Sequence, residues 1–132
     1  MQQTEHYQLN LIETSDPFSP EPLNKNTETV DAALATIPKF ACGAYNGNGA
    51  ANRSIELPFT PKMVYVINSN GATYYNNSGG IQNGGVALKG TPLSSNHGVL
   101  VEIVTGGFRV SFRHSYATVN SDGIAYRYFA LG

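Results

Sequence analysis

Few residues in this chain have the type and spacing that metal binding or redox chemistry requires. The three histidines, His6, His97 and His114, form no His-x-His or i, i+4 pair, so the sequence predicts no metal site and no bound cofactor. Cys42 is the only cysteine, which excludes an intrachain disulfide, a redox pair and a cysteine zinc cluster. We expect the Cys42 side chain to be a small apolar filler.

Two further sequence patterns could belong to a cofactor-binding or catalytic site, but neither supports an enzyme. The segment Gly47–Asn52 begins like a dinucleotide-binding fingerprint but lacks the third glycine, so we interpret it as a loop. After residue 41 the carboxylates are Glu56, Glu102 and Asp122, and the two glutamates are expected to face solvent from strands. A glycosidase would need two carboxylates about 5–9 Å apart. We therefore predict a protein that is not an enzyme, with a small carbohydrate-active enzyme as an alternative.

One stretch has the composition of a contact surface. Residues 68–85 carry no charge and consist mainly of Asn, Gly, Ser and Tyr. Antibody paratopes use this composition because Tyr gives broad contact at low entropic cost while Asn and Ser adapt their hydrogen bonds. Saccharides suit such a surface, since their C–H faces lie on aromatic rings. We expect Tyr74, Tyr75, Asn76 and Asn77 to bind a ligand; the alternative is a long loop that needs turn residues and nothing more.

Composition excludes several other classes. The chain has 132 residues, of which 41% are apolar and 13% charged, so it is expected to fold rather than to be a disordered polyelectrolyte. The net charge is −1, and no apolar run approaches the roughly 18–20 residues of a membrane span. Residues 41–132 carry six basic and three acidic side chains, a net of +3, which we assign to solvated strand faces. We therefore expect neither a nucleic acid nor a membrane as a partner.

The first forty residues are predicted to form an arm and one helix. They carry six acidic and two basic residues, and all 14 glycines of the chain come later. The helix starts at Ser19 or Glu21, runs through residues 23–37 and stops at Pro38. Its apolar residues form a narrow seam at 3/4 spacing: Leu23, Val30, Leu34 and Ile37. A helix of about 15 residues is marginal alone in water, so the seam is expected to dock on its own β domain or to associate with other copies.

Residues 41–132 are predicted to form a β domain, with the boundary near residues 38–43. Strands are expected over residues 54–59, 63–67, 99–104, 108–113 and 124–131, separated by Gly- and Asn-rich turns. Residues 63–67 are apolar at every position, which predicts a central strand. The predicted fold is thus mainly β: an N-terminal arm and helix over residues 1–40, followed by an antiparallel β-sandwich or jelly-roll-like domain over residues 41–132.

Both parts of the chain resemble bacteriophage and prophage tail proteins. The matching N-terminal patterns are His6-Tyr7-Gln8-Leu9-Asn10, Asp16-Pro17-Phe18, Leu23-Asn24-Lys25-Asn26 and Val30-Asp31-Ala32-Ala33-Leu34. The β region is similar to small distal domains of tail-fibre type through residues 43–49, residues 53–64 and the closing segment 123–132.

The resemblance implies a structural protein of the tail fibre or baseplate tip. It implies a homotrimer whose helices bundle through Leu23, Val30, Leu34 and Ile37, partnered with other tail and baseplate proteins. The implied location is the virion tail, assembled in the host bacterial cytoplasm, with the β domains facing a host-surface glycan. The chain is shorter than a typical fibre and has no shaft, so a baseplate or tip piece and a purely architectural spacer remain alternatives. Some fibre tips hold iron with a His-x-His motif, which is absent here.

Overall fold

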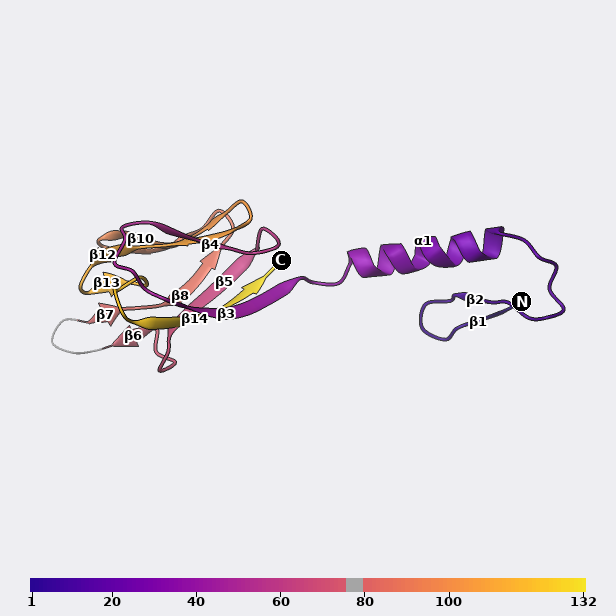
Figure 1. The fold of residues 1–132 in the computed structure, drawn as a ribbon, viewed down its shortest axis with the longest axis horizontal. Helices are drawn as coiled ribbons and strands as arrows, with labels where there is room; N and C mark the ends of the chain where they lie inside the picture. The colour runs from indigo at the N-terminus through magenta and orange to yellow at the C-terminus, as the bar shows by residue number, and fades with distance from the viewer. Residues whose placement is uncertain (76–79) are drawn as a thin grey trace. The chain divides into compact units, whose positions relative to one another are not determined.

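The computed structural model describes residues 1–75 and 80–132 and divides the chain into two compact units. The first unit is Met1–Pro38 and the second, the β domain, is Lys39–Gly132. In Figure 1 helix α1 belongs to the first unit, and the described residues of the second unit form strands and loops. None of the helices among the described residues combines the length and the apolar character needed to cross a bilayer.

The first unit is a short hairpin beside a helix. Strands β1 (Gln2–Gln3) and β2 (Asn10–Leu11) pair antiparallel, where the sequence had predicted only an extended arm. Helix α1 spans Glu21–Ala35, with a proline in its first turn and Glu21 at the positive end of its dipole. The Asn26 side chain joins the two parts: its Oδ1 accepts from the Asn10 backbone N–H at 2.6 Å, and its Nδ2 donates to the Asn10 carbonyl at 2.9 Å.

The predicted apolar seam of α1 is exposed. Leu23, Val30, Leu34 and Ile37 have exposed fractions of 46%, 41%, 60% and 59%, and Ile37 lies just beyond the end of the helix. The side of α1 that is partly covered has different residues, at the same spacing: Pro22, Asn26, Thr29 and Ala33. The hairpin therefore covers a mixed face of the helix and leaves the apolar seam uncovered.

The β domain contains three four-stranded sheets (Figure 1). The first has the order β3-β14-β5-β8, with β3 Phe40–Asn46, β14 Ala125–Leu131, β5 Met63–Asn68 and β8 Gly85–Leu88. The second has the order β4-β11-β10-β9, with β4 Arg53–Glu56, β11 Gly107–Val110, β10 Gly98–Val104 and β9 Leu93–Ser95. The third has the order β12-β13-β7-β6, with β12 Phe112–His114, β13 Ala117–Thr118, β7 Ile81–Gln82 and β6 Tyr74–Tyr75.

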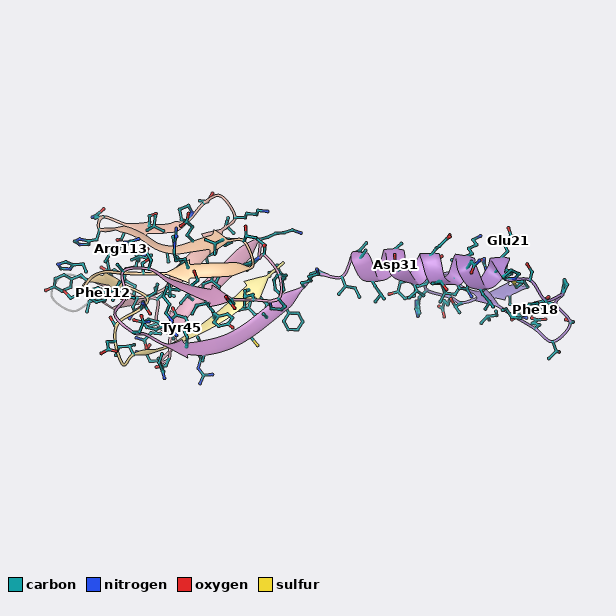
Figure 2. All side chains as sticks on the ribbon, turned by 45° about the horizontal axis from the view of Figure 1, so that its top comes forward. Phe18, Glu21, Asp31, Tyr45, Phe112 and Arg113 are labelled. Carbon is teal, nitrogen blue, oxygen red and sulfur yellow. The ribbon has the colours of Figure 1, made fainter. Side chains whose placement is uncertain are left out.

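The hydrophobic core lies between the first two sheets and is closed by residues of the third. Val64 and Val66 of β5 face Phe108 and Val110 of β11, all fully buried. Tyr45 and Tyr126 stack with ring centroids 5.3 Å apart, and Tyr45 lies inside the domain in Figure 2. The predicted mainly β fold with one helix and antiparallel sheets is confirmed. One bridge departs from the pattern, because β13 and β7 pair in parallel.

Three local expectations were wrong. The strand predicted over residues 108–113 is interrupted at Ser111, because the chain passes there from the second sheet to the third. Ser111 is buried at this crossing. The strand predicted over residues 54–59 ends at Glu56, ahead of Pro58. Cys42 is exposed and fills no gap in the core, because the alternation of β3 turns Tyr45 inward and Cys42 outward.

Candidate functional site

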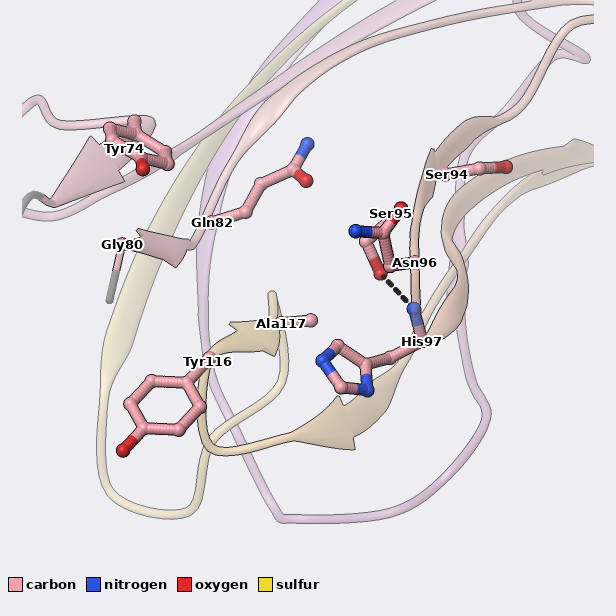
Figure 3. A pocket seen from close by; sticks show the side chains of 9 residues that line it. All are labelled: Tyr74, Gly80, Gln82, Ser94, Ser95, Asn96, His97, Tyr116 and Ala117. Atoms are coloured by element: carbon pink, nitrogen blue, oxygen red, sulfur yellow. Dashed lines mark hydrogen bonds between the residues drawn. The ribbon is translucent and has the colours of Figure 1, made fainter.

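A pocket of about 580 Å³ opens where the third sheet meets the turn between β9 and β10. This volume falls within the range of about 300–1,000 Å³ that small-molecule sites occupy. Figure 3 shows side chains from separate parts of the sequence facing the same space. The lining residues are Tyr74, Gly80, Gln82, Ser94, Ser95, Asn96, His97, Tyr116 and Ala117.

Two hairpins position the polar side chains of the pocket. β6 and β7 pair antiparallel and place Tyr74 opposite Gln82. In the β9–β10 turn, the Ser95 hydroxyl donates to the Gly98 carbonyl at 3.2 Å and accepts from the His97 backbone N–H at 3.1 Å (Figure 3). Gly98 has a φ of +117°, which favours glycine, so the tight turn depends on that residue. These bonds fix the backbone from which His97 projects into the pocket.

Three aromatic rings form a column along one side of the pocket. The His97 and His114 rings stack with centroids 4.5 Å apart and planes 9° from parallel. The Tyr116 ring lies 5.2 Å from that of His114. Nδ1 of His114 accepts from the Tyr116 backbone N–H at 3.2 Å. Each ring is therefore held by its neighbour, and Tyr116 stays 49% exposed at the pocket.

The base of the column is tied to the second sheet by Arg113. Its Nε donates to the Val99 carbonyl at 2.9 Å, and Nη2 donates to Oδ1 of Asn52 at 3.0 Å. Figure 2 places Arg113 and Phe112 at the same end of the β domain as β6 and β7 in Figure 1. Both guanidinium contacts lead away from the pocket, so Arg113 positions the turn rather than lining the site.

The pocket can form hydrogen bonds and stack rings, and the lining residues that the structure describes include no pair of carboxylates for acid–base chemistry. The carboxylates discussed from sequence lie elsewhere: Glu56 on β4 and Glu102 on β10, with β11 between the two strands. Glu102 forms an ion pair with Arg109. Among the described residues no group of three or more His, Cys, Asp and Glu side chains is arranged to hold a metal ion.

The ligand-binding residues predicted from sequence are only partly placed by the structure. Tyr74 lines the pocket and is 60% exposed. Asn76, Asn77 and the side chain of Tyr75 lie outside the described residues. Gly80 and Gln82 also line the pocket and belong to residues 68–85. The other lining residues come from two segments that were not predicted to bind a ligand: residues 94–97, with the composition Ser-Ser-Asn-His, and residues 116–117. Residues 94–97 contain no Asp, Glu, Lys or Arg, like the stretch around Tyr74, but no local pattern indicates that the two segments meet.

The loop over Gly47–Asn52 has a structural role. It is followed by strand β4 rather than by a helix, so it lacks the context of a dinucleotide site. Asn120 is fully buried, and its Nδ2 donates to Oδ1 of Asn48 at 2.8 Å and to the Ala50 carbonyl at 3.0 Å. The backbone N–H of Asn48 donates back to Oδ1 of Asn120 at 3.2 Å. One buried amide therefore fixes the course of the whole loop.

A second buried polar group lies beside this loop. The Tyr45 hydroxyl donates to the Val119 carbonyl at 2.6 Å. Burial raises the pKa of Tyr45 well above its ordinary value, and the nearby Tyr126 raises it further. The Arg53 guanidinium, 5.6 Å from the centre of the Tyr45 ring, acts in the opposite direction but is outweighed. Tyr45 is thus a neutral structural donor, outside the residues that line the pocket.

Comparison with protein-family models, with curated proteins and with solved structures found no match for the chain. The candidate site is therefore interpreted from its own geometry.

Proposed function

We propose that the pocket binds an uncharged saccharide, and that the chain is a phage-tail-like structural protein that contacts a bacterial host surface through this site. The observation that carries the proposal is the pocket lining, in which exposed aromatic rings stand beside amide and hydroxyl side chains. A protein with this role binds its ligand without transforming it. The resemblance of the sequence to tail-fibre and baseplate proteins supplies the proposed setting.

The aromatic rings suit the apolar faces of a sugar. Tyr74 and Tyr116 are 60% and 49% exposed, so both rings are free to contact a ligand. The Tyr116 ring belongs to the column with His114 and His97, which limits its movement before binding. A ring already held in place loses little conformational freedom when a ligand packs on it, and this preorganisation favours affinity.

The polar side chains suit the hydroxyl groups of a sugar. Gln82 and Asn96 each offer an amide donor and an amide acceptor, and Ser94 offers a hydroxyl. None of the described lining residues is Asp, Glu, Lys or Arg, so an uncharged ligand fits the pocket better than a phosphate or a carboxylate. Each neutral hydrogen bond contributes about 0.5–1.5 kcal/mol net, so a single pocket is expected to bind weakly.

The exposed seam of α1 fits a protein that works as several joined copies. Leu34 and Ile37 are about 60% exposed, an unfavourable state for large apolar side chains unless another surface covers them. Three such helices could cover one another, as the resemblance to trimeric tail proteins implies. Joining several weak pockets raises the overall affinity for a repetitive cell-wall polymer by a factor of about 10²–10⁴.

A glycan array followed by calorimetry tests the proposal on the full chain. We expect wild-type protein to bind at least one neutral cell-wall saccharide, and Tyr74→Ala and Tyr116→Ala each to weaken that binding at least tenfold. A tenfold loss corresponds to about 1.4 kcal/mol, which is less than the loss usually seen when a central aromatic contact is truncated. His97→Ala, which removes the end of the ring column, should also weaken binding.

His6→Ala is the matched control for His97→Ala, because His6 is an exposed histidine of the first unit and lies outside the pocket. It should bind as wild type does. A blank array would contradict saccharide binding and favour an architectural spacer. Unchanged binding by both tyrosine variants would show that the saccharide site is elsewhere. Hydrolysis of the bound saccharide would favour the carbohydrate-active enzyme.

A further inference from the structure

The outer face of the sheet β3-β14-β5-β8 is apolar across all four strands. Strand register places Phe129 of β14 between Cys42 of β3 and Tyr65 of β5, and Tyr65 lies opposite Val86 of β8. One step along the strands, Leu131 lies between Phe40 and Met63, and Met63 lies opposite Leu88. The inward neighbours of these residues form the core, so the eight form the opposite face of the sheet. We call these eight residues the outer apolar face.

Large side chains of the outer apolar face are accessible to solvent. The exposed fractions are 67% for Phe40, 48% for Leu88, 45% for Val86, 41% for Phe129 and 38% for Tyr65. The Phe40 and Phe129 rings stack with centroids 6.2 Å apart, which makes the surface continuous from β3 to β14. A contiguous exposed apolar surface is often functional in soluble proteins, whereas singly exposed apolar residues are ordinary.

The outer apolar face explains why strand β5 is apolar at every position from residue 63 to residue 67. Residues 63–67 are apolar at every position, a pattern typical of a strand that is covered on both sides. Among the described residues of the β domain, one side of this strand is covered and the other is not: Val64 and Val66 are buried, while Tyr65 is exposed. The sequence of β5 is therefore typical of a strand that is covered on both sides. We expect the second cover to come from outside the β domain.

From these observations the geometry points to a second copy of the chain as the occupant of the outer apolar face. Four strands about 4.8 Å apart and two outward positions per strand about 6.8 Å apart give a face of roughly 260 Å² in projection. A stable interface needs about 800 Å² from each partner, so this face supplies about a third of that area. The α1 seam is a second exposed apolar surface, and Phe40 follows Ile37 after two residues of chain. The self-association proposed for α1 therefore has a counterpart in the β domain that is close in sequence.

The chemistry of the face favours another apolar surface over other occupants. None of its eight residues is charged, and the next outward residue of β14, Arg127, is the first charge along that strand. A saccharide or an acidic partner would find few hydrogen-bonding or basic groups there. The face shares no residue with the pocket, so association through it and ligand binding can occur together. The inference adds a β-domain interface to the helix bundle and does not depend on saccharide binding.

Cys42 allows a direct test, because it is the only cysteine and lies on the outer apolar face. The full chain is labelled with a small maleimide over a range of protein concentrations, and the assembly state is measured in parallel by sedimentation velocity. We expect the Cys42 labelling rate to fall at least tenfold as the protein assembles. In dilute, dissociated protein the rate should approach that of glutathione.

Substitution of the face provides the second measurement. Tyr65→Ser with Phe129→Ser should raise the dissociation constant of the assembly at least tenfold, while the control Tyr116→Ser, an exposed tyrosine of the pocket, leaves it unchanged. The double variant should bind saccharide as wild type does per pocket, so failure of the interface and failure of the pocket are distinguishable.

Three results would overturn the inference. The first is a wild-type chain that stays monomeric at every concentration. The second is a Cys42 labelling rate that does not depend on concentration, which would mean either that the face is free or that the chain's own α1 covers it. The third is a Tyr65→Ser, Phe129→Ser variant that assembles as tightly as wild type, which would confine self-association to the helix.

Discussion

Asn120→Ala should destabilise the β domain strongly, although Asn120 lies outside the pocket lining. Its side chain makes three hydrogen bonds while fully buried: two from Nδ2, to Asn48 and Ala50, and one to Oδ1 from the Asn48 backbone. Each such bond contributes about 1 kcal/mol net. Asn48 is exposed, so water can replace part of what its groups lose. The expected loss in the free energy of unfolding is therefore about 2–3 kcal/mol.

Asn120→Asp is a sharper perturbation at the same position because it keeps the shape of the side chain. It replaces the donor Nδ2 with a carboxylate oxygen that faces two acceptors, Oδ1 of Asn48 and the carbonyl of Ala50. A buried charge without a partner costs several kcal/mol. At neutral pH, Asn120→Asp should therefore destabilise the domain more than Asn120→Ala does, and acidification that neutralises the carboxyl should reduce the difference.

Urea unfolding followed by near-ultraviolet circular dichroism measures these losses. Seven of the eight tyrosines belong to residues 41–132, so the signal reports mainly on the β domain. The matched control is Asn70→Ala: Asn70 is exposed, its Oδ1 accepts one hydrogen bond, from the Ala72 backbone, and its loss should cost less than about 0.5 kcal/mol. Asn120→Ala with a loss as small as that of Asn70→Ala would refute the role assigned to the buried amide.

Two further predictions concern the pocket and the core. Gly80 has a φ of +74°, and a Cβ added there would overlap the Tyr74 hydroxyl; Gly80→Ala should therefore lower stability by about 1 kcal/mol and displace the Tyr74 ring, measured as at least a tenfold loss of saccharide affinity in calorimetry. Unchanged affinity would mean that the position of Tyr74 is unimportant. Burial raises the pKa of Tyr45, so the folded protein retains this proton after the unfolded chain loses it near pH 10. The free energy of unfolding should fall above pH 10, and Tyr45 should contribute up to about 1.4 kcal/mol per pH unit to that fall. Urea titrations of Tyr45→Phe should show a shallower decline with pH than wild type. Equal slopes for wild type and Tyr45→Phe would contradict the burial argument.

The sequence was sufficient to predict the fold class because its signals are local. Alternating residues such as those of β14 and the glycine turn at Gly106 mark strands and hairpins one at a time, and the spacing that ends at Pro38 marks the helix. The break at Ser111 was missed because it depends on which sheet each half of the segment joins. The exposure of Cys42 was missed for a similar reason: its neighbours in β3 decide which face it occupies.

The candidate site was predictable only in part because its residues come from three separate segments. The uncharged composition of residues 68–85 drew attention to Tyr74, which lines the pocket. His97 and His114 are 17 positions apart and show no ligand spacing, yet the β9–β10 turn that carries His97 lies close enough to β12 for the two rings to stack. Long-range packing of this kind leaves no periodic signal in one sequence, so the ring column required the structure.

The most direct test of the proposed function is a map of where a bound saccharide touches the protein. The ¹⁵N–¹H amide spectrum of the full chain would be recorded during titration with the neutral saccharide that binds best on an array. We predict that the amides of Tyr74, Gln82, residues 94–97 and Tyr116 shift together along one binding curve. Shifts confined to the outer apolar face, or a spectrum that stays unchanged at millimolar saccharide, would contradict saccharide binding in the pocket.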